Sequence, residues 1–312
     1  MHSIRLNINN IKIKKIIKKM TAIRKEGRIN DNTTLIDIKM FGVPGITAIY
    51  LIESGKTCLI DGGTHTEARK ILRQLKELNV FPPDLIIITN SHWDHCQAIP
   101  FLSQRAKKEG KKIEILASVK AIPNLRDQSY NEIFGTGPFN NIEEEIIPLK
   151  EGDIVDLDGI TLKIIESPGH MTDHISIFDQ KNQNLFVGDT FGDKVSDIVF
   201  IPPFMPPYWD KDAFLNSIAK LKKIDFDTIS LAHFGTLDKY ESKNILDESV
   251  SNFDHWWTKF EENIDYLDDI PYMIDNVFSD LIPKSTIEKY PERLVEAIAF
   301  WLSEGFKISK GI

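Results

Sequence analysis

The chain has 312 residues, of which 42% are hydrophobic and 27% charged, as is usual for a globular protein with a sizeable core. Its net charge is −8, and because residues 1–28 hold nine Lys or Arg against one acid, the remainder carries −16, which argues against nucleic acid as a partner. No apolar run approaches the ~18–20 residues of a membrane span, and two cysteines are too few for a disulfide framework, so we expect a cytoplasmic protein.

Residues 1–28 are expected to form a basic N-terminal tail. In its central part, IKIKKIIKK (11–19), the lysines interrupt the apolar residues too often for a secretory signal. Three interpretations remain open. The segment is an amphipathic tail for a membrane surface or RNA, a disordered tail, or sequence that precedes a true start at Met20.

Hydrophobic periodicity predicts strands in hairpins first, and then strands that alternate with helices. Thr64 can cap a helix in which apolar residues recur at helical spacing. The run DLIIIT (84–89) is continuously apolar, as expected of a strand covered on both faces. The elements predicted in this half are strands over 35–41, 47–53, 57–61, 84–89 and 113–118 and helices over 65–78 and 97–109.

The second half continues the α/β pattern after an irregular stretch. Residues 121–145 carry glycines, prolines and several Asn, and we expect a loop insertion there. Asp158-Gly159 predicts a tight hairpin. The pattern as a whole favours an α/β layered sandwich over a doubly wound sheet. The further elements are strands over 153–157, 160–167, 175–179, 184–189 and 227–232 and a helix over 210–223.

Residues 29–240 are expected to form this domain, and residues 241–312 a helical extension packed on it. Within 252–267, apolar residues follow one helical stripe, which favours packing in the core or against a second copy of the chain over cofactor binding. The extension either covers the mouth of a site or supplies a homodimer surface. The stripe consists of Phe253, Trp256, Trp257, Phe260, Ile264 and Leu267.

Histidines and aspartates lie where four of the predicted strands end. Loops at the carboxyl edge of a sheet are held by a rigid scaffold, so ligands delivered there can converge on one site. Imidazole and carboxylate together suit zinc, iron or manganese better than calcium or magnesium. The residues are His92, Asp94 and His95 after 84–89, His170 after 160–167, Asp189 after 184–188, and His233 after 227–232.

These segments occur in an order that resembles the metallo-β-lactamase-fold superfamily. They are LIDGG (59–63), TNSHWDH (89–95), SPGH (167–170), VGD (187–189) and AHFG (232–235). The resemblance runs from about residue 35 to 240 and implies a four-layer αββα sandwich, here with additional C-terminal helices. It further implies a hydrolase that binds one or two metal ions per chain, Zn²⁺ first, with iron or manganese as alternatives.

The resemblance also implies two metal positions. The first would use Asn90, His92 and His170, and the second Asp94, His95 and His233; Asp189 would bridge both, and Asp61 would orient ligands from behind. Asn90 stands where the family has a histidine. Because an amide oxygen is a weaker zinc ligand than an imidazole nitrogen, we expect a weakened first position and a tight second one.

The implied reaction is hydrolysis by a metal-activated hydroxide, formed when the metal lowers the pKa of bound water toward ~7. Asp94 would relay the proton to the leaving group, and Tyr208 would donate a hydrogen bond to an oxyanion. The substrate would be a small ester, lactone, thioester or β-lactam-like molecule. The alternatives are a metal-bound sensor with little turnover, which Asn90 favours, or a phosphodiesterase.

Several neighbouring residues leave two interpretations open. His174 and His65 are either in contact with metal or substrate or are ordinary loop residues. Cys96 is either a soft metal ligand or a small core thiol. The walls of the site would come from 123–143 and 190–209, where aromatic side chains either line the site or pack in the core. The aromatic residues are Phe200, Phe204, Tyr208 and Trp209.

Overall fold

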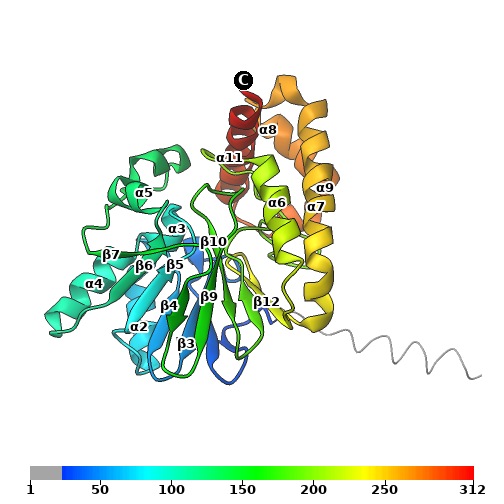
Figure 1. The fold of residues 1–312 in the computed structure, drawn as a ribbon. Helices are drawn as coiled ribbons and strands as arrows, with labels where there is room; N and C mark the ends of the chain where they lie inside the picture. The colour runs from blue at the N-terminus through cyan, green and yellow to red at the C-terminus, as the bar shows by residue number, and fades with distance from the viewer. Residues whose placement is uncertain (1–22) are drawn as a thin grey trace, which may run out of the picture.

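The computed structural model describes residues 23–312, so the basic segment 11–19 and its three interpretations lie outside the described residues. Two sheets lie face to face with helices outside each of them, which confirms the expected αββα sandwich (Figure 1). The first sheet is antiparallel from β1 to β4 and parallel from β4 to β7. In spatial order, its described strands are β1 (Gly27–Arg28), β2 (Thr33–Asp37), β3 (Ala48–Glu53), β4 (Thr57–Ile60), β5 (Leu85–Ile88), β6 (Glu114–Ser118) and β7 (Ile146–Leu149).

The second sheet is mixed. β11 and β12 are parallel, whereas every other neighbouring pair is antiparallel. β9, β11 and β12 therefore run in the same direction and end at one edge. In spatial order, its described strands are β13 (Gly235–Leu237), β12 (Thr228–Leu231), β11 (Asn184–Phe186), β10 (Ile175–Asp179), β9 (Thr161–Glu166) and β8 (Ile154–Asp156).

Helices cover the outer faces of both sheets. In Figure 1, α2 and α4 lie outside the first sheet and α6 and α7 outside the second, while α8 and α11 stand together at the top. The helices with at least four residues are α2 (Ala68–Glu77), α3 (Trp93–Cys96), α4 (Ile99–Lys108), α5 (Ile122–Arg126), α6 (Lys211–Leu221), α7 (Lys239–Glu262), α10 (Lys284–Ile287) and α11 (Glu292–Lys310), with η2 (Gln128–Phe134) and η4 (Met273–Phe278). The short turns are η1 (Met40–Gly42), η3 (Ile264–Tyr266), α8 (Ile270–Tyr272) and α9 (Ser279–Leu281).

Alternation along the strands creates two hydrophobic cores. In β3, Tyr50 and Ile52 pack between the two sheets, while Ile49 and Leu51 face the outer helices. Successive side chains of a strand point to opposite faces, so a strand between a sheet and helices must be apolar on both. The Tyr50 hydroxyl donates a hydrogen bond of 2.7 Å to the Leu231 carbonyl and thereby joins β3 to β12 of the other sheet.

Some elements differ from those expected. The stretch 121–145 is not simply a loop, because α5 and η2 occupy its first half. α4 confirms the helix expected over 97–109. A separate helical turn, α3, precedes it and carries Asp94 and His95. Thr64 bonds the Glu67 backbone N–H at 3.3 Å, and α2 begins at Ala68 rather than at residue 65. β1, β7 and β13 were not expected.

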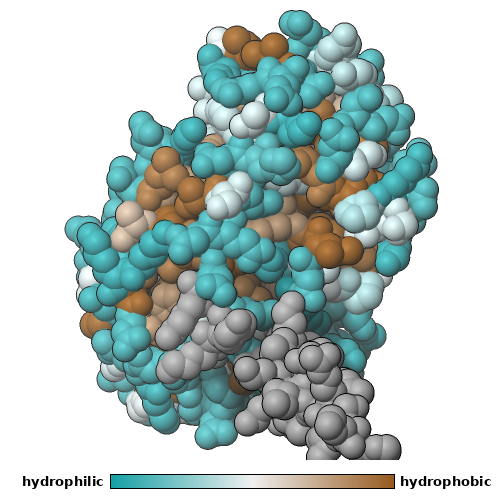
Figure 2. Space-filling view, turned by 90° about the vertical axis from the view of Figure 1, so that its right-hand side faces the viewer, coloured by the Kyte–Doolittle hydropathy of each residue, from teal (hydrophilic) through white to brown (hydrophobic). Residues whose placement is uncertain are grey.

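The C-terminal helices belong to the same core as the sheets. Of the predicted aromatic stripe, Phe253, Trp257 and Phe260 are buried within the chain, whereas Ile264 is 42% exposed. This outcome agrees with the core interpretation of the stripe. The side of the molecule that carries α7 and α9 is mostly hydrophilic, with hydrophobic side chains gathered across its middle (Figure 2). Among the described residues, no helix combines the length and the apolar character that crossing a bilayer requires.

Gly305 on α11 lies against the segment that carries Phe204. A Cβ atom added to Gly305 would stand 2.1 Å from the Phe204 carbonyl oxygen, which is a backbone atom and cannot rotate away. Glycine lowers helix stability elsewhere, so its presence here reflects this close approach.

We expect Gly305→Ala to lower the free energy of unfolding by about 1–3 kcal/mol, as overpacking of a core does. Urea denaturation monitored by tryptophan fluorescence measures the change. Glu296→Ala, at an exposed position of the same helix, is the matched control and should change stability little. A neutral or stabilising effect of Gly305→Ala would show that α11 is free to move away from Phe204.

Candidate metal centre

The carboxyl ends of four described strands meet at one edge of the sandwich. β5 leads into His92, Asp94 and His95, and the loops after β9, β11 and β12 carry the other candidate ligands. The structure therefore brings together the histidines and aspartates that sequence spacing singled out. Ligand atoms lie within 4.8 Å of one another in each of three buried or half-buried groups: His92, His170 and Asp189; Asp94, His95 and His233; and Asp189, Asp193 and His233.

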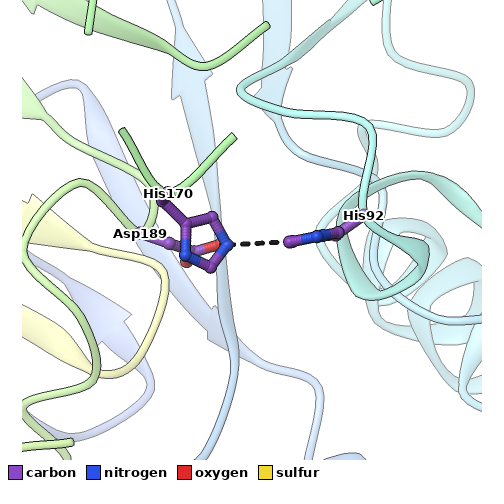
Figure 3. Close-up of side chains that lie close together, drawn as sticks. All are labelled: His92, His170 and Asp189. Carbon is purple, nitrogen blue, oxygen red and sulfur yellow. Dashed lines mark hydrogen bonds and ion pairs between the residues drawn. The ribbon is translucent and has the colours of Figure 1, made fainter. Parts of the chain in front are cut away.

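His92 and His170 approach each other through one ring nitrogen each. His170 Nδ1 donates to the Pro203 carbonyl at 2.8 Å, and His92 Nε2 donates to the Pro206 carbonyl at 3.1 Å. The remaining nitrogens, His92 Nδ1 and His170 Nε2, are 2.8 Å apart, and Asp189 Oδ2 is 3.3 Å from the latter (Figure 3). In neutral rings these atoms are both acceptors, so a proton or a metal ion between them removes the repulsion.

A ring nitrogen of His95 likewise lies close to an oxygen of Asp189. His95 Nδ1 lies 2.9 Å from Asp61 Oδ2, and in a neutral ring that donates there Nε2 keeps a lone pair. That Nε2 lies 2.8 Å from Asp189 Oδ2, yet it has no hydrogen-bond partner of acceptable geometry among the described residues. Two buried atoms that approach closely without an aligned hydrogen bond are the arrangement expected of two ligands directed at one ion.

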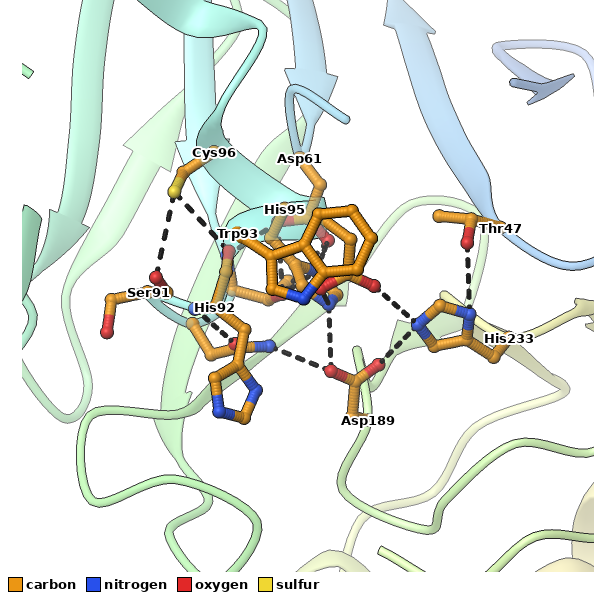
Figure 4. A network of polar contacts seen from close by, with 12 residues as sticks. Thr47, Asp61, Ser91, His92, Trp93, His95, Cys96, Asp189 and His233 are labelled. Atoms are coloured by element: carbon orange, nitrogen blue, oxygen red, sulfur yellow. Dashed lines mark hydrogen bonds and ion pairs between the residues drawn. The ribbon is translucent and has the colours of Figure 1, made fainter. Parts of the chain in front are cut away.

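His233 completes the group from the second sheet. Its Nδ1 donates to the Ile46 carbonyl at 2.8 Å, and Nε2 lies 3.1 Å from Asp94 Oδ2 and 3.5 Å from Asp189 Oδ1. Figure 4 shows Asp189 between His233 and the side chains of the 89–96 loop. Burial disfavours a charged ring, but Asp193, Asp189 and Asp94 outweigh it and raise the pKa of His233 to about 10.

The donor set fits a metal ion. Without metal, protons on His95 and His233 are needed to offset the charge of the buried carboxylates, and the carboxylates accordingly raise the pKa of both rings despite burial. A divalent cation satisfies the same atoms without those protons. Imidazole nitrogens with carboxylate oxygens are suitable ligands for zinc, iron or manganese.

Asn90 is oriented differently from the expected oxygen ligand. Its Oδ1 accepts the His92 backbone N–H at 2.9 Å, and its Nδ2 donates to Asp189 Oδ2 at 3.0 Å. A backbone N–H can only donate, so it fixes which way the amide faces. The oxygen is thus turned away from Asp189, and the side chain orients that carboxylate instead of offering a lone pair to the first metal position.

Asp61 supports the loop from behind, where the sequence placed it. Its carboxylate accepts the Thr89 backbone N–H at 2.8 Å and the Thr89 hydroxyl, in addition to His95 Nδ1. Asp61 has φ of 66°, a left-handed conformation that residues other than glycine rarely adopt. Such conformations persist where surrounding contacts over-determine them, often at functional sites.

His174 has both ring nitrogens occupied by protein groups. Its Nε2 accepts the Asp189 backbone N–H at 3.1 Å, and its Nδ1 lies 3.0 Å from the Ser167 hydroxyl. This contact requires Gly188, because an added Cβ there would come within 2.5 Å of His174 Nε2. Burial lowers the pKa of His174 to about 3, which keeps the ring neutral. Of its two interpretations, the hydrogen-bonded loop residue agrees with the structure.

Other candidates do not reach the group. His65 is exposed, and the buried Cys96 thiol lies 3.3 Å from the His92 carbonyl and 3.4 Å from Gln128 Oε1. Tyr208, expected to act on an oxyanion, is 38% exposed and its ring faces Tyr130 at 5.8 Å between centroids.

A cavity with about 60 Å³ of space for water-sized groups lies beside the candidate ligands, and its walls differ from those expected. None of the four aromatic residues suggested in 190–209 lines it; Phe204 and Trp209 instead pack with Phe253. Asp193 was not among the predicted site residues. The C-terminal extension, for which one interpretation was that it covers the mouth of a site, contributes Leu294, Ile298 and Trp301 of α11 to the lining. Asp193 lies four residues after Asp189, a spacing with no regular meaning in a loop, and burial raises its pKa to about 6. The lining residues are Met40, Ile46, His92, Trp93, Asp94, Phe134, His170, Asp189, Asp193, Met205, His233, Leu294, Ile298 and Trp301.

The family model of the metallo-beta-lactamase superfamily matches residues 42–233, a range that holds every candidate ligand. The chain belongs to this superfamily. It is 33% identical over 153 residues to a "Probable metallo-hydrolase" of Methanocaldococcus jannaschii, covering 49% of this chain and 71% of that relative. It is 31% identical over 194 residues to a hydroxyacylglutathione hydrolase of Hahella chejuensis, covering 61% and 62%.

A solved structure resembles this chain in fold over a larger part of its length than the relatives just named do in sequence. The subclass B3 metallo-beta-lactamase BJP-1 of Bradyrhizobium japonicum superposes with a TM-score of 0.59 at 20% identity, covering 80% of this chain and 99% of that one. At this identity the likeness concerns the fold alone. Together with the family match, it agrees with the resemblance in the sequence motifs, and the protein is a hydrolase of this superfamily.

Asp61→Asn is expected to weaken metal binding by about 10- to 100-fold, as loss of a partner behind a metal-ligating histidine typically does. The change leaves His95 Nδ1 without its carboxylate acceptor. Titration of the apoprotein with Zn²⁺ in competition with a chromophoric chelator measures the affinity.

Cys96→Ser is the matched buried control, because its thiol contacts protein carbonyls only weakly. It should leave the affinity for Zn²⁺ unchanged. Equal weakening by both variants would contradict the assignment of Asp61 and restore Cys96 as a candidate ligand.

Proposed function

We propose that this protein is a metal-dependent hydrolase of small esters, thioesters or lactones, with two neighbouring metal positions. The first position would be held by His92, His170 and Asp189. The second would be held by Asp94, His95 and His233, with Asp189 shared. The observation that carries the proposal is that buried ring nitrogens and carboxylate oxygens of these six side chains lie within 4.8 Å of one another in each group, a donor set that suits a divalent cation.

Zn²⁺ is the ion we propose first, and iron and manganese suit the same donors. When bound, the metal supplies a nucleophile by lowering the pKa of water and polarises the substrate carbonyl as a Lewis acid. Asn90, which donates to Asp189 Oδ2, takes the place of a seventh ligand. We therefore retain the expectation that the first position binds metal more weakly than the second.

Asp94 is the proposed proton carrier. Burial opposes its ionisation, but His95 and His233 outweigh burial and lower the pKa of Asp94 to about 2, so it is a carboxylate at neutral pH. It lines the cavity, where it can accept a proton from the attacking water. The acyl carbon gains the hydroxyl of water, the carbon–oxygen or carbon–sulfur bond breaks, and the proton passes through Asp94 to the leaving atom.

The relatives and the cavity together support an acyl substrate. A relative that covers 61% of this chain is named for hydrolysis of hydroxyacylglutathione, which is a thioester. No Lys or Arg is present among the described residues that line the cavity, whereas a phosphodiester would need cations around its non-reacting oxygens. The phosphodiesterase alternative is therefore not the one we propose.

Asp94→Asn is expected to lower kcat by about 10²–10⁴-fold, the usual contribution of a positioned acid or base. Asn90→Ala removes one hydrogen bond to a carboxylate and should cost about tenfold. Steady-state hydrolysis of 4-nitrophenyl acetate by the zinc-loaded protein gives both values.

His65→Ala, at an exposed position outside the cavity, serves as the control and should match the unaltered protein. Metal content is measured for each variant, so that loss of the ion is separated from loss of proton transfer. Equal and small effects of Asp94→Asn and Asn90→Ala would overturn the role given to Asp94.

A further inference from the structure

A second cavity adjoins the metal-site cavity and is almost entirely apolar. It offers about 60 Å³ of space to water-sized groups, as much as the metal-site cavity does. Four residues line both cavities and form their shared boundary: Ile46, Asp193, Leu294 and Ile298. We propose that the second cavity receives the aliphatic chain of a neutral acyl substrate whose carbonyl lies at the metal centre, an inference that rests on the proposed hydrolase function.

Apart from Asp193 and Tyr290, the residues that line the second cavity are all apolar. Its walls are built by the C-terminal helices, including Ile287 of α10 and Val295 of α11, and by the loop that carries Val199 and Ile201. Several of these side chains are only half-buried, so they keep apolar surface that a substrate chain can cover. Burial of that surface together with a hydrocarbon chain is favourable in proportion to the area removed from water.

Charge selects against anionic substrates at the boundary between the cavities. Asp193 faces both, Asp94 and Asp189 line the metal-site cavity, and neither lining contains a Lys or Arg among the described residues. Metal ions supply positive charge only at the reacting carbonyl. A carboxylate or phosphate remote from that carbonyl would meet Asp193 without a compensating cation. The favoured substrate is therefore an uncharged ester, thioester or lactone with an alkyl chain.

Chain-length dependence of hydrolysis tests the proposal. For 4-nitrophenyl esters from acetate to dodecanoate, kcat/KM should rise about fourfold per added methylene until the second cavity is filled (about 0.8 kcal/mol for each buried methylene). Val295→Trp fills the cavity without altering a residue that lines the metal site. It should remove the gain for long chains and leave acetate hydrolysis unchanged.

Two further variants keep this result interpretable. Ile287→Trp fills the same cavity from α10 and should act as Val295→Trp does. Ile308→Trp adds the same bulk at a 43% exposed position of α11 and should retain the full chain-length dependence. Circular dichroism and thermal unfolding establish that each variant is folded before its kinetics are compared.

A binding measurement separates this inference from the proposed function. Fluorescence of N-phenyl-1-naphthylamine reports occupation of the apolar cavity, and 1-dodecanol should displace the probe at lower concentration than dodecanoate does. Val295→Trp should weaken both the probe and the alcohol.

The outcomes are distinct. If short esters are hydrolysed but kcat/KM is independent of chain length, the acyl-chain site is wrong and the hydrolase stands. If dodecanol binds and Val295→Trp abolishes binding, but no ester, thioester or lactone is turned over, the proposed function is wrong and the apolar site stands. Tighter binding of dodecanoate than of dodecanol would overturn the selection against anions.

Discussion

The arrangement of the site depends on one electrostatic conflict. Buried imidazole nitrogens and carboxylate oxygens face one another at hydrogen-bond distance with lone pairs on both sides, most clearly at His95 Nε2 and Asp189 Oδ2, 2.8 Å apart. Groups of this kind are stable in a protein interior only when a proton or metal ion lies between them. The remainder of the sandwich holds these atoms in place against their mutual repulsion.

The fold holds the facing nitrogens and oxygens in place with neutral backbone groups as well as with charged side chains. The outer nitrogens of three histidines donate to the carbonyls of Ile46, Pro203 and Pro206, and the fourth donates to Asp61. Each of these bonds fixes a tautomer and turns the free nitrogen inward. The carbonyl partners come from loops that show no sequence signal, since a backbone oxygen exists at every residue.

This distinction explains how far the sequence could predict the molecule. Apolar alternation is a local property, so most strands were predicted to within a few residues. The structure brings together the six imidazole and carboxylate candidates that follow the ends of those strands. The roles of Asn90 and Tyr208 depended instead on side-chain orientation. The His92 backbone amide orients Asn90, and Tyr208 lies against Tyr130. Neither contact follows from a regular spacing of residues, so the sequence pattern does not predict it.

The C-terminal helices also shape the site through contacts that the sequence pattern does not reveal. α11 packs through Gly305 directly on the backbone at Phe204, next to Met205, which lines the metal-site cavity, and the same helix contributes Leu294, Ile298 and Trp301 to that cavity. One helix thus supports a loop of the metal site and also shapes the space beyond it. Proteins that share one scaffold can differ in substrate through such additions, because the additions alter the walls of the cavity and leave the residues at the strand ends in place.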